Sequence, residues 1–136
     1  MTKEIDFSKY GKRFQESLAQ MILDDRPFAD QIEEVLDTQF FELKYLRVFV
    51  SKIYEYRKKY GVHPTKEILA SILRTELENH NEAVQKQVRD YFARTLIKTV
   101  DDEEYIKETS LDFCKKQKLK DALMQSVDLI QNSSYD

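Results

Sequence analysis

The sequence predicts an all-α protein, and three observations lead to this fold class. Apolar side chains recur at steps of three and four residues through most of the chain, which places them on one face of a helix. The 136 residues include only two glycines and two prolines, too few for the turns of a β-rich fold. Charged residues make up 35% of the chain, which is typical of long solvated helix faces. We therefore expect a compact bundle of about five helices, followed by a long projecting C-terminal helix that forms the first arm of a helical hairpin.

The N-terminal part is predicted to form two helices separated by a short acidic turn. The first helix begins at Phe7 or Gly11 and runs to Leu23. Two aspartates follow as candidate N-caps, and Pro27 suits the first position of a new helix. The second helix is expected over about 27–36, before a polar break.

The next stretch, residues 40–73, is predicted to form a helical hairpin around which the other helices are organised. One apolar stripe marks its first helix: Leu46, Phe49, Ile53, Tyr56 and Tyr60. Gly61 provides the stop, at a position that often needs a positive φ. The following helix opens at Pro64 or Thr65. Its inward face is predicted to contain Ile68, Leu69, Ile72 and Leu73.

Two further helices complete the pattern. The fifth is expected over about 82–98, with Val84, Val88, Phe92 and Leu96 at four-residue spacing. The last, over about 103–132, has an irregular apolar first half, a basic middle, and a regular apolar seam in its second half. Such a helix is expected to project from the core or to pair with another helix. The predicted organisation is thus a globular domain over 1–100 and a C-terminal helix over 101–136.

The residues offer no catalytic constellation. Gly11 and Gly61 are the only glycines, so neither G-x-x-x-x-G-K-[ST] nor G-x-G-x-x-G can be built. His63 and His80 are expected to be surface histidines, because no H-E-x-x-H pattern or other ligand spacing accompanies them. Pairs of acidic residues stand at predicted helix starts, where capping explains them. We predict no catalytic, cofactor-binding or metal-binding residue in these 136 positions.

Charge, cysteine content and apolar run length limit the class of protein. A formal net charge of −3 argues against a dedicated nucleic-acid binder. The basic run at Arg57 and the lysines between 115 and 120 are interpreted as solvated faces, with a weak phosphate contact as the alternative. Cys114, the single cysteine, is expected to be a packing residue in a reducing cytoplasm. No secretory signal or membrane-spanning run is present, so we expect a soluble intracellular protein.

The order of several segments is similar to that of a known family. The segments are Ser17 to Asp25, Arg26 to Ile32, Asp37 to Phe41, Val48 to Thr65, and Tyr105 to Asp136. Together they resemble the N-terminal domain of DnaB-type replicative DNA helicases, particularly those of phages. The match rests on aliphatic and turn positions over most of the chain.

The resemblance implies a collar domain of a hexameric helicase, which mediates oligomerisation and binds primase and helicase loader in the primosome. It implies no catalysis in this chain, because ATP and magnesium are used by a separate C-terminal motor and DNA contacts belong to the parent protein. We expect the chain to be a fragment cut before that motor, with the second hairpin arm beyond Asp136. A phage-encoded helicase would act in the cytoplasm of the bacterial host.

The predicted interface lies mainly on the last helix. It comprises Leu119, Leu123, Val127 and Ile130, with Tyr105 and Phe113, and we expect self-association as a dimer or higher oligomer. Tyr45 and Tyr54 are further tyrosines that an interface could use. The alternative function is a free-standing small helical phage adaptor or regulator that binds a host protein. A small enzyme and a direct DNA-binding module are weaker alternatives.

Overall fold

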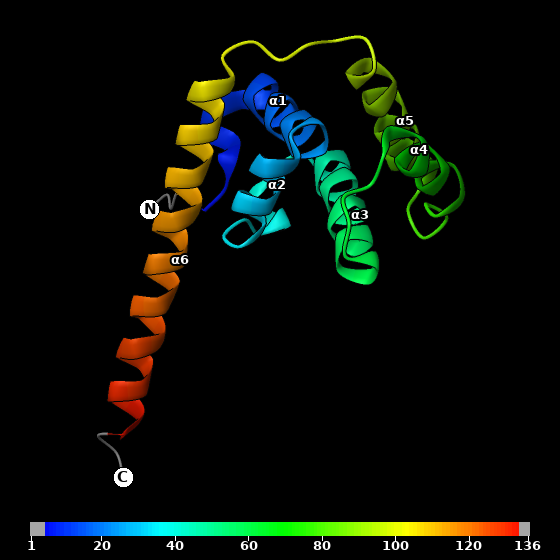
Figure 1. The fold of residues 1–136 in the computed structure, drawn as a ribbon. Coiled ribbons are helices and arrows are strands. Elements are labelled where there is room, and N and C mark those ends of the chain that lie inside the picture. Colours follow the sequence, from blue (N-terminus) through cyan, green and yellow to red (C-terminus); the bar gives the residue numbers. More distant parts are fainter. Residues whose placement is uncertain (1–4, 134–136) are drawn as a thin grey trace.

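The structure, a computed structural model, describes residues 5–133, and its regular elements within that range are all helical (Figure 1). The α-helices are α1 (Gly11–Asp24), α2 (Arg26–Glu33), α3 (Lys44–Tyr60), α4 (Lys66–Thr75), α5 (Glu82–Thr95) and α6 (Glu103–Ser133). Two short 3-10 helices are η1 (Phe7–Tyr10) and η2 (Thr38–Phe40). The predicted fold class is confirmed: five helices are followed by one long C-terminal helix.

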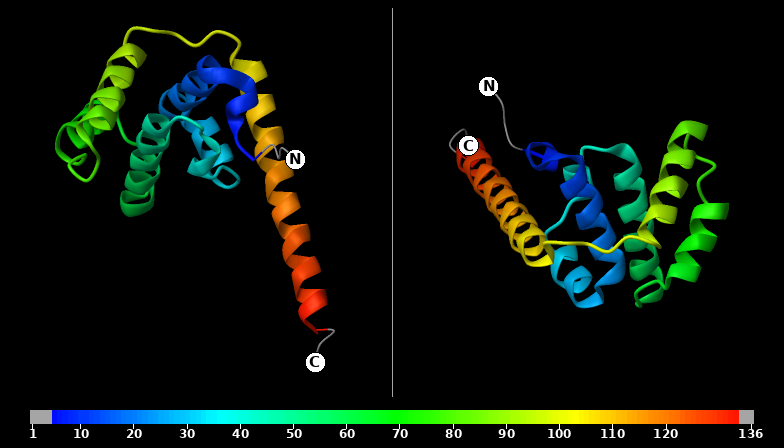
Figure 2. Two further views of the ribbon diagram at one scale, coloured as in Figure 1. Left: turned by 180° about the vertical axis from the view of Figure 1, so that it is seen from behind. Right: turned by 90° about the horizontal axis from the view of Figure 1, so that it is seen from above.

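Helix α1 lies at the centre of the body and contacts α2, α3, η1 and α6 (Figures 1 and 2). Helices α4 and α5 contact each other and α3 on one side of the molecule, whereas α6 lies on the other side. An extended connection carries the chain from α5 over α1 to the start of α6. The C-terminal part of α6 continues well beyond the other helices (Figure 1).

Local capping explains where most of these helices begin and end. The side chain of Asp25 accepts a hydrogen bond from the backbone N–H of Phe28, 3.1 Å away, as the sequence predicted. Thr65 and Asn81 cap α4 and α5 in the same way. Gly61 ends α3 with a φ of 72°, which confirms its predicted role because this left-handed conformation favours glycine.

A cluster of aromatic rings joins α6 to the N-terminal segment. Phe7 is fully buried, and five rings have centroids 4.9–6.4 Å from its own: Tyr10, Phe14, Phe40, Phe41 and Phe113. Phe113 comes from α6 and is only 6% exposed. The prediction that Phe113 belongs to an intermolecular interface is therefore corrected, because its ring is enclosed by the core of its own chain.

A polar network links α1, α3 and α5 inside the body. The guanidinium of Arg94 donates two hydrogen bonds, of 2.8 and 3.1 Å, to the carboxylate of Glu16. The hydroxyl of Tyr45 donates to the same carboxylate over 2.5 Å. Burial by itself raises the pKa of Glu16, but the hydrogen bonds from Arg94 and Tyr45 outweigh it and hold this pKa below its ordinary value. Tyr45 is thus a core residue and not the interface tyrosine that the sequence allowed.

A second network fastens α2 and the α3–α4 turn. Arg57 donates hydrogen bonds to Asp30 and Glu33 of α2, the latter over 3.1 Å. The ring of His63 bridges Arg57 and the backbone carbonyl of Leu23, at 2.7 Å from each. His63 is half-buried, so the expectation of a surface histidine is corrected: its ring cross-links two parts of the body.

Several element bounds differ from the predicted ones for physical reasons. Gly11, with a φ of 88°, separates η1 from α1, and α2 ends three residues early at Glu33. Helix α5 ends at Thr95, so Leu96 lies half-exposed in the connection. The buried side chain of Gln20 donates to the backbone carbonyls of Thr95 and Lys98, at 3.4 and 2.5 Å, and so fixes the turn that follows α5.

Candidate interaction surface

The first half of α6 belongs to the body of the molecule. Its buried residues are Ile106, Ser110, Phe113, Cys114 and Gln117. Lys107 forms an ion pair with Asp25 over 2.8 Å, and Lys118 donates to the backbone carbonyl of Glu34 over 3.2 Å. Burial acts to raise the pKa of Asp25, but hydrogen bonds from Lys107 and from the Phe28 backbone outweigh it and lower this pKa. The packed core thus continues beyond residue 100, as far as Gln117.

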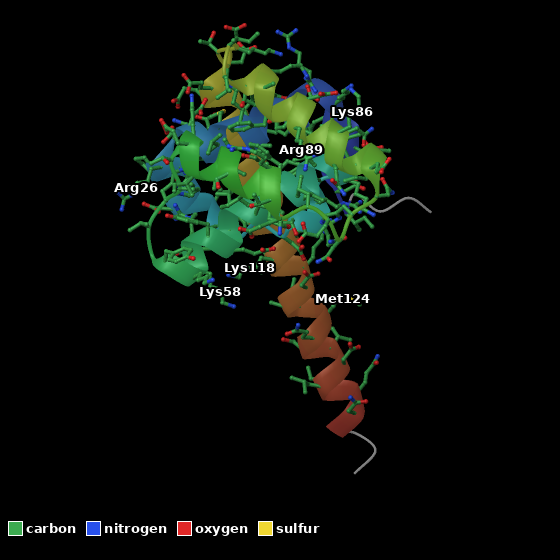
Figure 3. The ribbon with its side chains drawn as sticks, turned by 90° about the vertical axis from the view of Figure 1, so that its right-hand side faces the viewer. Arg26, Lys58, Lys86, Arg89, Lys118 and Met124 are labelled. Carbon is green, nitrogen blue, oxygen red and sulfur yellow. The ribbon has the colours of Figure 1, made fainter. Side chains whose placement is uncertain are left out.

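The second half of α6, residues 119–132, has no buried residue; we call it the distal half. Its large apolar side chains are 45–69% exposed: Leu119, Leu123, Met124, Val127, Leu129 and Ile130. Figure 3 shows this segment below the body, with Lys118 near the lower edge of the body and Met124 farther out along the helix. Exposure of so many large apolar side chains on one helix marks an interaction surface.

The distal seam does not continue the face by which α6 packs on the body. We call Leu119, Leu123, Val127 and Ile130 the seam. At 3.6 residues per turn, its centre is rotated by about 130° around the helix axis from the centre of the buried face. If α6 only extended past the body without a binding role, its apolar residues would be expected to stay on the buried side of the helix. The seam therefore faces away from the body, toward space that another chain or segment can enter.

Apolar residues also extend beyond the seam. Met124 and Leu129 lie on opposite flanks of it, each about 110° around the axis from its centre. Between 122 and 130 the only charged residue is Asp128. A single partner helix covers one stripe of a helix, as in a two-stranded coiled coil. Coverage of Met124 and Leu129 as well calls for a bundle of three or more helices.

The structure separates the six predicted interface residues into three places. Leu119, Leu123, Val127 and Ile130 share the seam. Tyr105 is 58% exposed but lies at the start of α6, beside η1 and α1. Phe113 is in the core. Sequence analysis missed Met124 and Leu129, because a search for steps of three and four follows one stripe only; the low charge of 122–130 was the signal that could have found them.

Other kinds of site find little support in the part of the chain that the structure describes. Over residues 5–133 no three histidine, cysteine or acidic side chains are grouped so that they could hold a metal ion. Within the same range no helix is both long and apolar enough to cross a bilayer. Cys114 is fully buried, as predicted, and burial raises the pKa of its thiol to about 12.

Comparisons of the chain with protein-family models, with curated proteins and with solved structures gave no match. The resemblance to the N-terminal domain of DnaB-type helicases therefore stays a prediction from the sequence.

Proposed function

We propose that this chain is a non-catalytic helical assembly domain that self-associates through the distal half of α6. The observation that carries the proposal is the seam, whose side chains are exposed and face away from the body. Covering one leucine side chain is worth roughly 1.5–3 kcal/mol. Several such side chains per chain can offset the roughly 4–15 kcal/mol that association costs in lost freedom of motion.

At a finer level, we propose that the domain is the collar of a DnaB-type replicative helicase. The support is the sequence resemblance together with the architecture it implies, a helical body with a long projecting C-terminal helix. On this proposal primase and helicase loader are further partners, and DNA, ATP and magnesium are handled by a separate motor. The site of action is the cytoplasm of a bacterial cell.

The association is tested by sedimentation equilibrium on the chain and on seam variants. We expect a dimer or larger oligomer, and we expect Leu123→Glu and Val127→Glu to yield monomers because a buried carboxylate without a partner is costly. Gln125→Glu is the matched control: it places the same charge on the opposite side of the same helix. An unmodified chain that is still monomeric at about 200 µM has a dissociation constant above roughly that concentration. This result would contradict self-association.

The helicase assignment has its own test in the reading frame downstream of Asp136. We expect a second hairpin arm, a linker and a G-x-x-x-x-G-K-[ST] motif. A stop codon shortly after Asp136 would contradict the helicase assignment. It would favour the alternative, a free-standing adaptor that uses the same seam to bind a host protein.

A further inference from the structure

A cleft of about 380 Å³ lies where η1, α1, the α5–α6 connection and the start of α6 meet. Figures 1 and 2 show how the connection passes over α1 to reach α6 at this place. Its volume falls within the range of roughly 300–1,000 Å³ that is usual for small-molecule sites. The cleft lies at the opposite end of α6 from the distal half, so the proposed self-association leaves it unexplained.

Aromatic rings form much of the cleft wall. Tyr105 is 58% exposed, and its ring meets Phe14 at a centroid distance of 6.3 Å and an interplanar angle of 83°. Phe14 in turn lies 4.7 Å from the ring of Tyr10, tilted by 30°. These contacts hold Tyr105 against the wall while more than half of its surface is open. An open tyrosine ring supported in this way can stack against a planar ligand.

Two of the cations that line the cleft have no acidic partner among residues 5–133. Arg13 and Lys98 line it, and neither is within 4.0 Å of a carboxylate among residues 5–133. Lys9 lies over the ring of Tyr10, 5.1 Å from its centroid. In a chain with a net charge of −3, two cations without acidic partners beside an open aromatic ring favour an anionic, planar ligand.

Hydrogen-bond acceptors complete the lining. Asp101 and Asp102 come from the α5–α6 connection, and Ser17 adds a hydroxyl. Asp102 has a φ of 55° and is the one non-glycine residue with positive φ among those described, while its carbonyl accepts the first bond of α6 from Ile106 over 3.1 Å. Carboxylates at this position can accept hydrogen bonds from the amino group of a base.

We propose that this cleft binds one nucleotide unit. The base stacks on Tyr105 and donates to Asp101 or Asp102, and the phosphate is bound by Arg13 and Lys98. The unit can be a free nucleotide or one residue of a single strand, since both present the same base and phosphate. Arg13 and Lys98 share the cleft with two carboxylates, so binding is weak and its salt dependence corresponds to about one phosphate.

The test is a titration of the isotope-labelled full chain, followed by amide chemical shifts, with dAMP and separately with a single-stranded hexamer of deoxyadenylate. We expect shifts confined to residues 9–17 and 98–106. Tyr105→Ala and Arg13→Ala should each weaken binding about tenfold, in line with the usual contribution of one stacked base or one phosphate contact. Matched controls are Tyr60→Ala, because Tyr60 is 57% exposed outside the cleft, and Arg74→Ala on α4. Both controls should bind as the unmodified chain does.

The two ligands distinguish the source of the nucleotide. Similar binding of both indicates that a single nucleotide unit suffices, and binding of the hexamer alone indicates a strand; either result supports the proposal if the two cleft variants weaken it. Absence of shifts with both ligands at about 10 mM, well above a millimolar dissociation constant, overturns it. Binding that Tyr105→Ala and Arg13→Ala leave unchanged also overturns it. Neither outcome bears on self-association through α6, which the seam variants test.

Discussion

At the scale of single residues, the ion pair between Glu16 and Arg94 links a buried side chain to a half-exposed one. The side chain of Glu16 is 11% exposed, whereas that of its partner Arg94 is 49% exposed. The two ends of this ion pair are therefore in different surroundings. Removing one end leaves either a buried carboxylate or a guanidinium that water can reach, and these losses differ in cost.

We expect Arg94→Met to destabilise the chain more than Glu16→Gln does. The first leaves a buried carboxylate with Tyr45 as its remaining side-chain donor and should cost about 2–3 kcal/mol. The second leaves a half-exposed guanidinium and should cost about 1 kcal/mol. Urea denaturation gives both values, and Arg74→Met at an exposed position of α4 should stay within about 0.5 kcal/mol of the unmodified chain. Equal losses of unfolding free energy in Arg94→Met and Glu16→Gln would contradict the expected difference between the two ends of the ion pair.

Stability should also fall at acidic pH. The pKa values of Glu16, Asp25 and Asp30 are all lowered in the folded chain. A carboxyl whose folded pKa lies below its unfolded value stabilises the fold at a pH above the unfolded value, and this contribution is lost as the pH falls through the folded pKa. We expect the urea midpoint to be level above about pH 5 and to fall from there to pH 3. The fall should be shallower in Glu16→Gln and unchanged in Glu78→Gln, whose carboxyl is exposed.

Most of these buried polar contacts could not be predicted from the sequence. Phe14, Leu18, Met21 and Ile22 of α1 recur at helical spacing in the sequence, and all four are buried. Gln15, Glu16 and Gln20 are buried as well, because α1 is surrounded on nearly all sides. The partners of Glu16 stand 29 and 78 positions away, so a periodicity argument treats this glutamate as solvent-facing.

At the scale of elements, the sequence predicted the positions of the helices but not where several of them end. Leu96 continued the four-residue spacing of α5 and was predicted to lie within it. Helix α5 nevertheless ends in a turn at Leu96, and Gln20 donates to the backbone carbonyls of Thr95 and Lys98 on either side of this turn. Within α6 the seam was visible in the sequence. Its rotation away from the buried face was not, since that angle requires knowing that Phe113 and its neighbours pack on the body.

The two halves of α6 should therefore respond differently to the same kind of change. Phe113→Ala should cost about 3–5 kcal/mol, as is usual for a buried phenylalanine. Truncation after Lys120 should change the free energy of unfolding by less than about 0.5 kcal/mol, because it removes only exposed side chains from the described helix. Both are measured by urea denaturation at a concentration where the unmodified chain is monomeric, since association would add stability. A large loss on truncation would show that the distal half supports the body.

At the scale of the whole molecule, the chain has a body with a packed core and a distal half of α6 that lies outside this core. The body has one continuous core that includes the first half of α6. The distal half, residues 119–132, has no buried residue, and most helical stability in proteins comes from packing of an apolar face. Its helical state should then depend on a partner that covers the seam. Folding of this segment and assembly of the protein become one equilibrium.

Helicity should consequently rise with protein concentration. Residues 119–132 are roughly one-tenth of the 136, so from dilute to concentrated samples the mean residue ellipticity at 222 nm should increase by about one-tenth of the value of a fully helical chain. Leu123→Glu should remain at the dilute value throughout, because a carboxylate in the covered seam opposes association. Gln125→Glu should follow the unmodified chain, since it changes the opposite side of the helix. Constant ellipticity over a range in which sedimentation shows association would mean that the distal half is helical before it meets a partner, and that assembly joins preformed surfaces.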